Sequence, residues 1–129
     1  MQARGSGKGR KAKRTVSAGA ESVARHLNTA VAAWPKVRIT RMFGRWGYFV
    51  GDQLFGCFPL RPKEHDLWIR LTLGDQTRAL KTPGITPHRR FARRGWVECQ
   101  VESREGISRA LRWLRRSYES VMTRLPEGG

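Results

Sequence analysis

The sequence predicts an α+β fold, in which an antiparallel sheet of about five strands forms one layer and two terminal helices form the other. Two observations predict this two-layer sandwich. Apolar residues recur at helical spacing near both ends of the folded region, whereas they alternate with polar residues in the segments between. The alternating segments are joined by short turns, which antiparallel strands permit and parallel strands do not. We therefore expect both helices to cover one face of the sheet.

A basic arm is predicted over residues 1–17, followed by one folded domain over residues 18–126. Six basic residues precede the first acidic residue, Glu21, and their neighbours are mostly Gly, Ala and Ser. Such a segment buries too little apolar surface to offset the entropy cost of ordering it. We therefore expect the arm to be disordered.

The first helix is predicted to have Ser17 as its N-cap and to end at Pro35. Between these two residues, Val23, Leu27 and Val31 recur at helical spacing and form one apolar face. This face is expected to pack on the sheet.

Three strands of a meander follow, over residues 37–42, 48–50 and 54–58. Val37 and Ile39 alternate with basic residues, as they do in a half-buried strand. Gly51 and Asp52 form a tight hairpin turn between the second and third strands. These three strands are therefore expected to be neighbours in the sheet.

The remaining predicted segments are a strand, a short helix, a loop, a strand and a long helix, over residues 67–71, 75–81, 84–95, 96–101 and 103–125. Pro83 and Gly84 end the short helix. Ser103 is the expected N-cap of the long helix, which Pro126 ends.

The charge of the chain points to a polyanionic partner. Lys and Arg number 26 against 10 Asp and Glu, which gives a formal charge of +16, and the arm supplies six of these positive charges. A surface this cationic concentrates polyanions nearby and speeds their encounter with it. Most of the basic residues are arginines, whose planar guanidinium suits bidentate phosphate contacts, although a genome rich in arginine codons would give the same excess.

Three basic features are candidate contacts with nucleic acid. They are Arg10, Lys11, Lys13 and Arg14 in the arm, Arg89, Arg90, Arg93 and Arg94 in the predicted loop, and Arg109, Arg112 and Arg116 on one face of the long helix. If the three lie on one side of the molecule, they form a surface that follows a phosphate backbone. The alternative is that the arm serves solubility and the arginines are merely solvated.

Two aromatic residues are candidates for stacking on exposed bases. Phe91 lies among the loop arginines, although burial in the core is the commoner outcome for such a residue. Trp68 is out of phase with Leu67 and Ile69, so it is expected to emerge on the opposite face of the sheet. Together with Arg38, Arg41 and Arg70 it would form an aromatic and basic platform, suited to nucleic acid or to a protein partner.

No catalytic residues, metal ligands or cofactor motif are predicted. Glu64, His65 and Asp66 are consecutive, and adjacent residues of a strand point to opposite faces, so they are not a preassembled acid–base set. The sequence has no Cys-x-x-Cys or His-x-x-x-His spacing and no glycine-rich phosphate loop before a helix. We therefore expect a protein that is not an enzyme and needs no cofactor.

A cytoplasmic location without membrane contact is expected. No apolar run approaches the roughly 20 residues that cross a bilayer, and the first residues lack the apolar core of a secretory signal. Cys57 and Cys99 fall in predicted strands, and in a reducing compartment such cysteines are usually buried free thiols.

Five short motifs, in this order along the chain, resemble the N-terminal domain of the competence regulator TfoX and the wider YjbR-like family. They are Met42-Phe43-Gly44, the segment 48–55, the segment 67–71, Pro83-Gly84 followed by Pro87, and Gly95-Trp96-Val97. The resemblance spans roughly residues 19–125. It implies an α+β sandwich with a curved antiparallel sheet and a link to transcriptional control, and it offers no catalytic residues to carry over.

These observations together predict a non-catalytic protein, associated with nucleic acid or with regulation, that binds the phosphate backbone with little sequence preference. No base-reading element such as a helix-turn-helix is recognisable. The alternatives are a protein-interaction adaptor and a small-molecule-binding domain.

Overall fold

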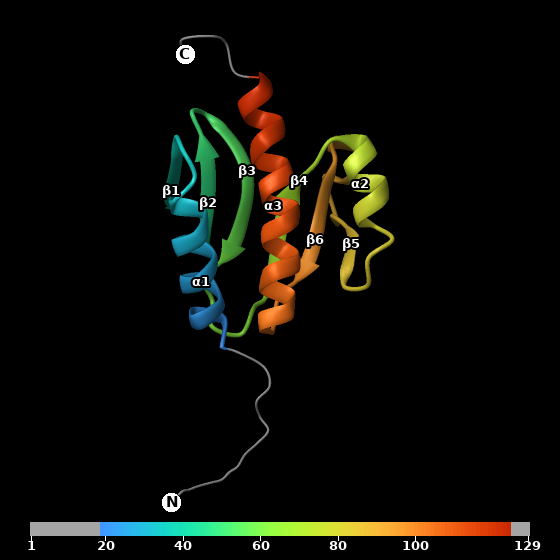
Figure 1. Ribbon diagram of the computed structural model, residues 1–129. Helices are drawn as coiled ribbons and strands as arrows, with labels where there is room; N and C mark the ends of the chain where they lie inside the picture. The colour runs from blue at the N-terminus through green and yellow to red at the C-terminus, as the bar shows by residue number, and fades with distance from the viewer. Residues whose placement is uncertain (1–18, 125–129) are drawn as a thin grey trace, which may run out of the picture.

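Six antiparallel strands form one open sheet in the order β1-β2-β3-β4-β6-β5 in the computed structural model, which describes residues 19–124 (Figure 1). The strands are β1 (Val37–Met42), β2 (Arg45–Val50), β3 (Gln53–Pro59), β4 (Asp66–Arg70), β5 (Ile85–Pro87) and β6 (Trp96–Gln100). The predicted α+β class and the antiparallel sheet are confirmed. The sheet has one strand more than the five expected, because β5 lies in the segment predicted as a loop.

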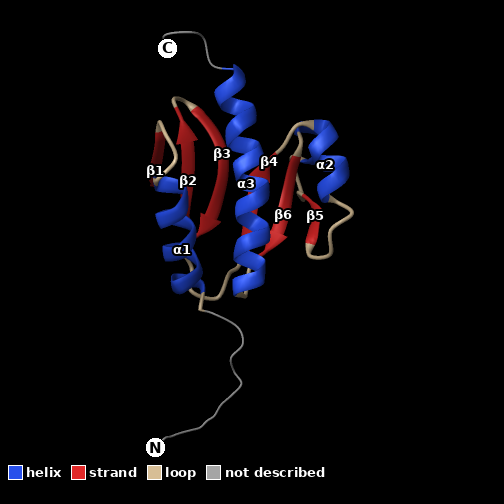
Figure 2. Cartoon of the chain, in the orientation of Figure 1, coloured by secondary structure: helices blue, strands red, loops and turns tan. Residues whose placement is uncertain are grey.

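Within residues 19–124 three α-helices accompany the sheet, together with a short 3-10 turn, η2 (Ala92–Arg94). They are α1 (Ala20–Ala32), α2 (Leu73–Ala79) and α3 (Arg104–Arg124). Figure 1 and Figure 2 show α1 and α3 side by side on the same face of the sheet, as expected for the two terminal helices. The predicted arm and its disorder, the N-cap Ser17 and the helix end at Pro126 all lie outside the described residues.

The core fills the space between the sheet and these two helices. Its largest fully buried side chains are Tyr48, Phe55, Phe58, Leu27, Leu67, Ile69 and Leu114. Burying one such side chain contributes about 1.5–3 kcal/mol, so this layer holds the fold together. The long helix α3 begins as predicted, because the Ser103 hydroxyl accepts a hydrogen bond of 3.1 Å from the Gly106 N–H.

Because α1 and α3 both pack on one face of the sheet, neither of them covers the other face, which we call the open face. Leu67 and Ile69 point into the core, so Trp68 between them lies on this open face, as predicted. Cys57 on β3 and Glu98 on β6 are the register partners of Trp68 and share its face. The open face is where the candidate site is found.

One member of the predicted platform lies elsewhere. Arg38 and Arg41 are three positions apart on β1, so they point to opposite faces. The guanidinium of Arg41 lies 5.8 Å from the ring centre of Trp46, which packs against the core on the helix side. Arg38 instead lies over its register partner Phe49, at 4.7 Å. Placing Arg41 on the open face was therefore wrong.

Candidate nucleic-acid interface

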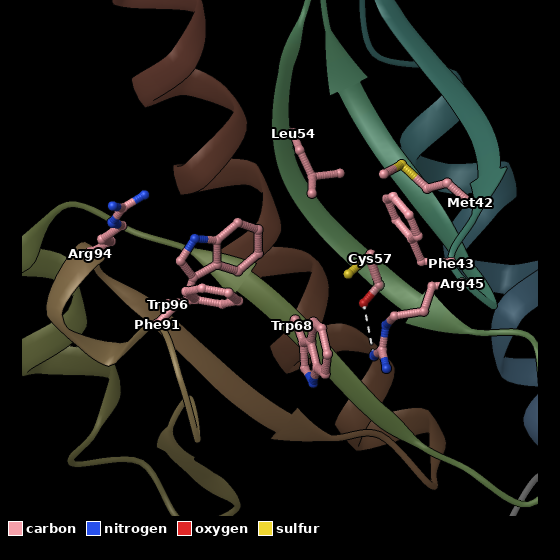
Figure 3. A pocket seen from close by; sticks show the side chains of 9 residues that line it. All are labelled: Met42, Phe43, Arg45, Leu54, Cys57, Trp68, Phe91, Arg94 and Trp96. Carbon is pink, nitrogen blue, oxygen red and sulfur yellow. Dashed lines mark hydrogen bonds between the residues drawn. The ribbon is translucent and has the colours of Figure 1, made fainter.

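An apolar groove of about 290 Å³ crosses the open face of the sheet (Figure 3). Its lining is mostly aromatic and aliphatic, with two arginines: Met42, Phe43, Arg45, Leu54, Cys57, Trp68, Phe91, Arg94 and Trp96. The strands β2, β3, β4 and β6 supply its floor, and Met42 at the end of β1 adds to the lining. The β1–β2 turn and the loop before β6 supply its two rims.

The floor of the groove is held rigidly around Trp68. The guanidinium of Arg45 lies 3.8 Å from the centre of the Trp68 ring, a close cation–π contact. The indole N–H of Trp68 donates to the carboxylate of Asp66 at 2.9 Å, and Arg45 pairs with that same carboxylate at 3.5 Å. Arg45 also donates to the backbone carbonyls of Cys57, at 3.4 Å, and of Asp66. Trp68 is thus fixed in one orientation while remaining partly exposed.

The thiol of Cys57 completes the floor, where it is only 5% exposed. Burial raises its pKa, against the opposing influence of the nearby Arg45 guanidinium. The thiolate that a nucleophile requires is therefore disfavoured. Cys57 and Cys99 are both buried and carry free thiols, as predicted.

One rim of the groove is the loop of residues 88–94, built around a buried histidine. His88 is 3% exposed, and its Nδ1 accepts the backbone N–H groups of Arg90 and Phe91, both at 3.0 Å. Burial lowers the pKa of His88, which favours the neutral ring that can accept these bonds. The ring stacks on Phe91 at 5.2 Å and meets Trp68 edge-on at 4.4 Å, so it joins the loop to the floor.

Arg89 ties this loop to the sheet. Its Nε and Nη2 donate to the two carboxylate oxygens of Glu98 at 2.8 Å, and its backbone N–H adds a third bond at 3.0 Å. These hydrogen bonds lower the pKa of Glu98 to about 2. Arg89 also lies 3.7 Å from Asp66. Its charge is therefore balanced within the protein, although the side chain is exposed.

The other loop arginines are left without acidic partners. Arg90, Arg93 and Arg94 are exposed and form no ion pair with any residue between 19 and 124. Arg94 lines the groove directly, and Arg93 lies beside it in η2. The unpaired Arg94 thus lines the apolar groove, and the unpaired Arg90 and Arg93 belong to the loop that forms its rim.

The opposite rim is Phe43, at the tip of the β1–β2 turn. It is 92% exposed and has a φ of 50°, in the left-handed region. Large apolar side chains that are exposed in the described residues are Phe43, Leu73 and Phe91, at 92%, 60% and 44%. Two of these three line the groove, from opposite sides (Figure 3). Phe91 is consequently available for stacking rather than buried in the core.

The helix arginines lie in the other layer. The helix α3 covers the face of the sheet opposite the groove, and its buried residues are Gly106, Ile107, Ala110, Leu114, Ser117, Tyr118 and Val121. Arg109 and Arg112 form no ion pair with a described residue, so their charges remain available. The condition for one continuous surface, that the loop and the helix arginines lie on one side of the molecule, is therefore not met.

Arg116 has a contact that the sequence did not indicate. Its guanidinium donates two hydrogen bonds to Asp75 of α2, at 2.9 and 3.0 Å, and so joins α2 to α3. These bonds lower the pKa of Asp75, and Arg78 pairs with the same carboxylate. The arm residues Arg10, Lys11, Lys13 and Arg14 lie outside the part of the chain that the structure describes.

Several groove residues were missed by the sequence analysis. Phe43 was noted only in a motif and Cys57 only as a thiol, Trp96 was placed in the last strand, and Arg45 was not among the candidate residues. Pairing β3 with β4 in the register that places Cys57 opposite Trp68 would have predicted that these two floor residues are neighbours on one face. The position of the 88–94 loop could not be predicted in this way, because it depends on contacts that His88 and Arg89 make with residues of other strands.

Between residues 19 and 124 no three His, Cys, Asp or Glu side chains gather as they would to hold a metal ion. No helix in that range combines the length and apolar character that crossing a membrane requires.

The chain matches no protein-family model and no curated protein. That the chain belongs to the family of the TfoX N-terminal domain therefore stays a prediction, which rests on the sequence motifs alone.

Proposed function

We propose that this domain is a non-catalytic nucleic-acid-binding module that binds the phosphate backbone with little sequence preference. The observation that carries this proposal is the set of unpaired arginines Arg90, Arg93 and Arg94 at the rim of an aromatic groove. Guanidinium groups with no internal acidic partner are free to bind phosphate. The formal charge of +16 would draw a polyanion towards this surface.

The acidic residues near the groove do not oppose this role. Asp66 and Glu98 are the carboxylates beside Trp68, and each is paired with an arginine, Arg45 for the first and Arg89 for the second. A phosphate approaching the groove therefore meets neutralised acids and free cations. Arg89, although a predicted contact, supports the site mainly by holding the loop in place.

The salt dependence of binding tests the proposal. Full-length protein is titrated into labelled single-stranded and duplex oligonucleotides of mixed sequence at several salt concentrations, and binding is followed by fluorescence anisotropy. The Kd should rise steeply with salt and differ little between sequences. Replacing both Arg93 and Arg94 by Ala removes two phosphate contacts, so the slope on duplex should fall by about 1.8.

The matched control is the pair Arg109→Ala and Arg112→Ala, which removes the same charge from the other layer. A smaller change in slope for this pair places the main contact at the loop. Equal losses from both pairs would indicate attraction by total charge alone. Undetectable binding at low salt, to DNA and to RNA, would reject the proposal and favour a protein-interaction adaptor.

A further inference from the structure

We propose that the groove on the open face holds an unpaired nucleobase, so that single-stranded nucleic acid is the preferred ligand. This inference rests on the proposed function, because it assigns the base-binding part of the same surface. Phosphate contacts explain attraction to any nucleic acid, whereas a base site explains a preference among its forms.

The chemistry of the groove suits a flat, aromatic ring. Its wall and floor offer aromatic rings from four separate elements, namely Phe43, Trp68, Phe91 and Trp96. Its volume of about 290 Å³ lies at the lower end of the range for ligand sites, which fits one ring system better than a large ligand. Bases stack on such side chains with little regard to sequence, because every base has a π-face.

The exposure of Phe43 and Phe91 is the second step of the argument. Leaving a large aromatic side chain in water forgoes about 1.5–3 kcal/mol of burial energy, which applies to Phe43 at 92% exposure and in part to Phe91 at 44%, and both residues line one groove. Phe43 also occupies a left-handed conformation at the tip of its turn, which favours glycine or asparagine over phenylalanine. An aromatic residue in this place is better explained by a partner than by the fold.

The floor is already organised to receive a ring. The guanidinium of Arg45 covers one face of the Trp68 ring, and Asp66 accepts the hydrogen bond of the indole N–H. The edge contact with His88 joins the Trp68 ring to the loop. A side chain fixed by its own protein loses little further entropy when a base stacks on it. Preorganisation of this kind is expected at a binding site and is not required of a solvent-exposed tryptophan.

The positive charge beside the groove favours an aromatic ring that carries phosphate groups, as a nucleobase in nucleic acid does. Arg94 lines the groove and Arg93 precedes it in η2, both without acidic partners among residues 19–124, so a base in the groove would bring its phosphates close to the guanidinium of Arg94. The bases of a duplex are stacked inside it and cannot enter a groove on a sheet. A strand with unpaired bases satisfies both the aromatic rings and the arginines.

The test compares two oligonucleotides that differ only in their bases. One is a labelled 12-mer of thymidine, and the other is a 12-mer of the same length made entirely of abasic nucleotides, so the phosphates are equal in number. Full-length protein should bind the thymidine strand about tenfold more tightly or better, because one stacked base contributes about 1–3 kcal/mol. A duplex 12-mer should bind more weakly than the thymidine strand at the same salt.

The variant Phe43→Asn links this difference to the groove. Asparagine tolerates the left-handed conformation, so the turn is kept while the ring is removed. Affinity for the thymidine strand should fall towards that of the abasic strand, whose own affinity should not change. Leu73→Asn is the matched control, because Leu73 is exposed but does not line the groove, and it should leave both affinities unchanged.

The outcomes separate the two proposals. Equal affinity for the thymidine and abasic strands would overturn the base site while leaving phosphate binding intact. The same fold-change for both strands in Phe43→Asn would also overturn it. If neither strand binds at low salt, the proposed function itself fails. Loss of the thymidine preference in Phe43→Asn, with Leu73→Asn unaffected, is the result we expect.

Discussion

At the scale of single residues, the most consequential contact is the bidentate pair of Arg89 and Glu98. Glu98 is buried on the open face, whereas Arg89 is 63% exposed and reaches back from the 88–94 loop. A buried carboxylate must be satisfied by hydrogen bonds, and three of them come from this one residue. The pair therefore decides where the loop, and with it Phe91 and Arg94, rests on the sheet.

Replacing Glu98 with Gln should destabilise the domain by about 1–2 kcal/mol at pH 7, because the charge-assisted bonds to Arg89 are lost. Urea unfolding followed by tryptophan fluorescence measures the change. Glu119→Gln is the control, since Glu119 forms an exposed pair with Arg115 on α3 and should cost about 0.5 kcal/mol or less.

The cost of Glu98→Gln should depend on pH in a stated direction. The pKa of Glu98 lies at about 2 in the folded protein, below its usual value of 4.5. A group with a lowered pKa stabilises the fold above its unfolded value, and the effect is lost as pH falls towards the folded value. The difference between wild type and Glu98→Gln should therefore be constant above about pH 5 and shrink between pH 4.5 and 2. A difference that grows on acidification would contradict this assignment.

At the scale of elements, the position of β6 depends on a glycine that ends η2. Gly95 has a φ of 94°, and a Cβ built there would lie 1.9 Å from the carbonyl oxygen of Leu71. The Gly95 carbonyl accepts the Leu71 N–H at 3.0 Å, so two backbone segments cross here without room for a side chain. This crossing fixes the position of Trp96, the next residue, which lines the groove.

Gly95→Ala should therefore cost about 3 kcal/mol or more, since the backbone must move as well as adopt a strained φ. Gly84→Ala is the matched control. Gly84 has a similar φ of 89° but nothing within 4 Å of its Cβ position, so only about 1–2 kcal/mol of conformational strain is expected. Urea unfolding of both variants gives the comparison, and equal costs would show that the crossing is not tight.

The elements also show how far the sequence could be read. Periodicity predicted α1, α3 and the meander, and strand alternation placed Trp68 on the open face, because these features depend on neighbours along the chain. It missed β5, whose three residues give no alternation. It also missed the ion pairs that commit Arg89 and Arg116, since their partners lie on other elements. The floor residues Cys57 and Trp68 could be predicted to be neighbours from the register of β3 and β4, but the position of the 88–94 loop could not.

At the scale of the whole molecule, charge acts on folding and on binding in opposite ways. The formal charge of +16 leaves many cations without acids, and their mutual repulsion destabilises the compact state. Salt screens this repulsion, because the Debye length falls from about 30 Å at 0.01 M to about 8 Å at 0.15 M. The same salt would weaken the attraction for phosphate that we propose.

The free full-length protein should therefore become more stable as NaCl rises from 0.01 to 0.15 M, by on the order of 1 kcal/mol, or about 4–8 °C in Tm. Scanning calorimetry measures this directly. A variant with Arg109→Glu and Arg112→Glu lowers the net charge of α3 by four, because two positive charges are replaced by two negative ones, and it should show a smaller rise. Adding a single-stranded oligonucleotide should raise Tm most at low salt, where binding is tightest. A Tm that falls with salt in the free protein would mean that its internal ion pairs outweigh its repulsions, and the unpaired arginines would then need another explanation.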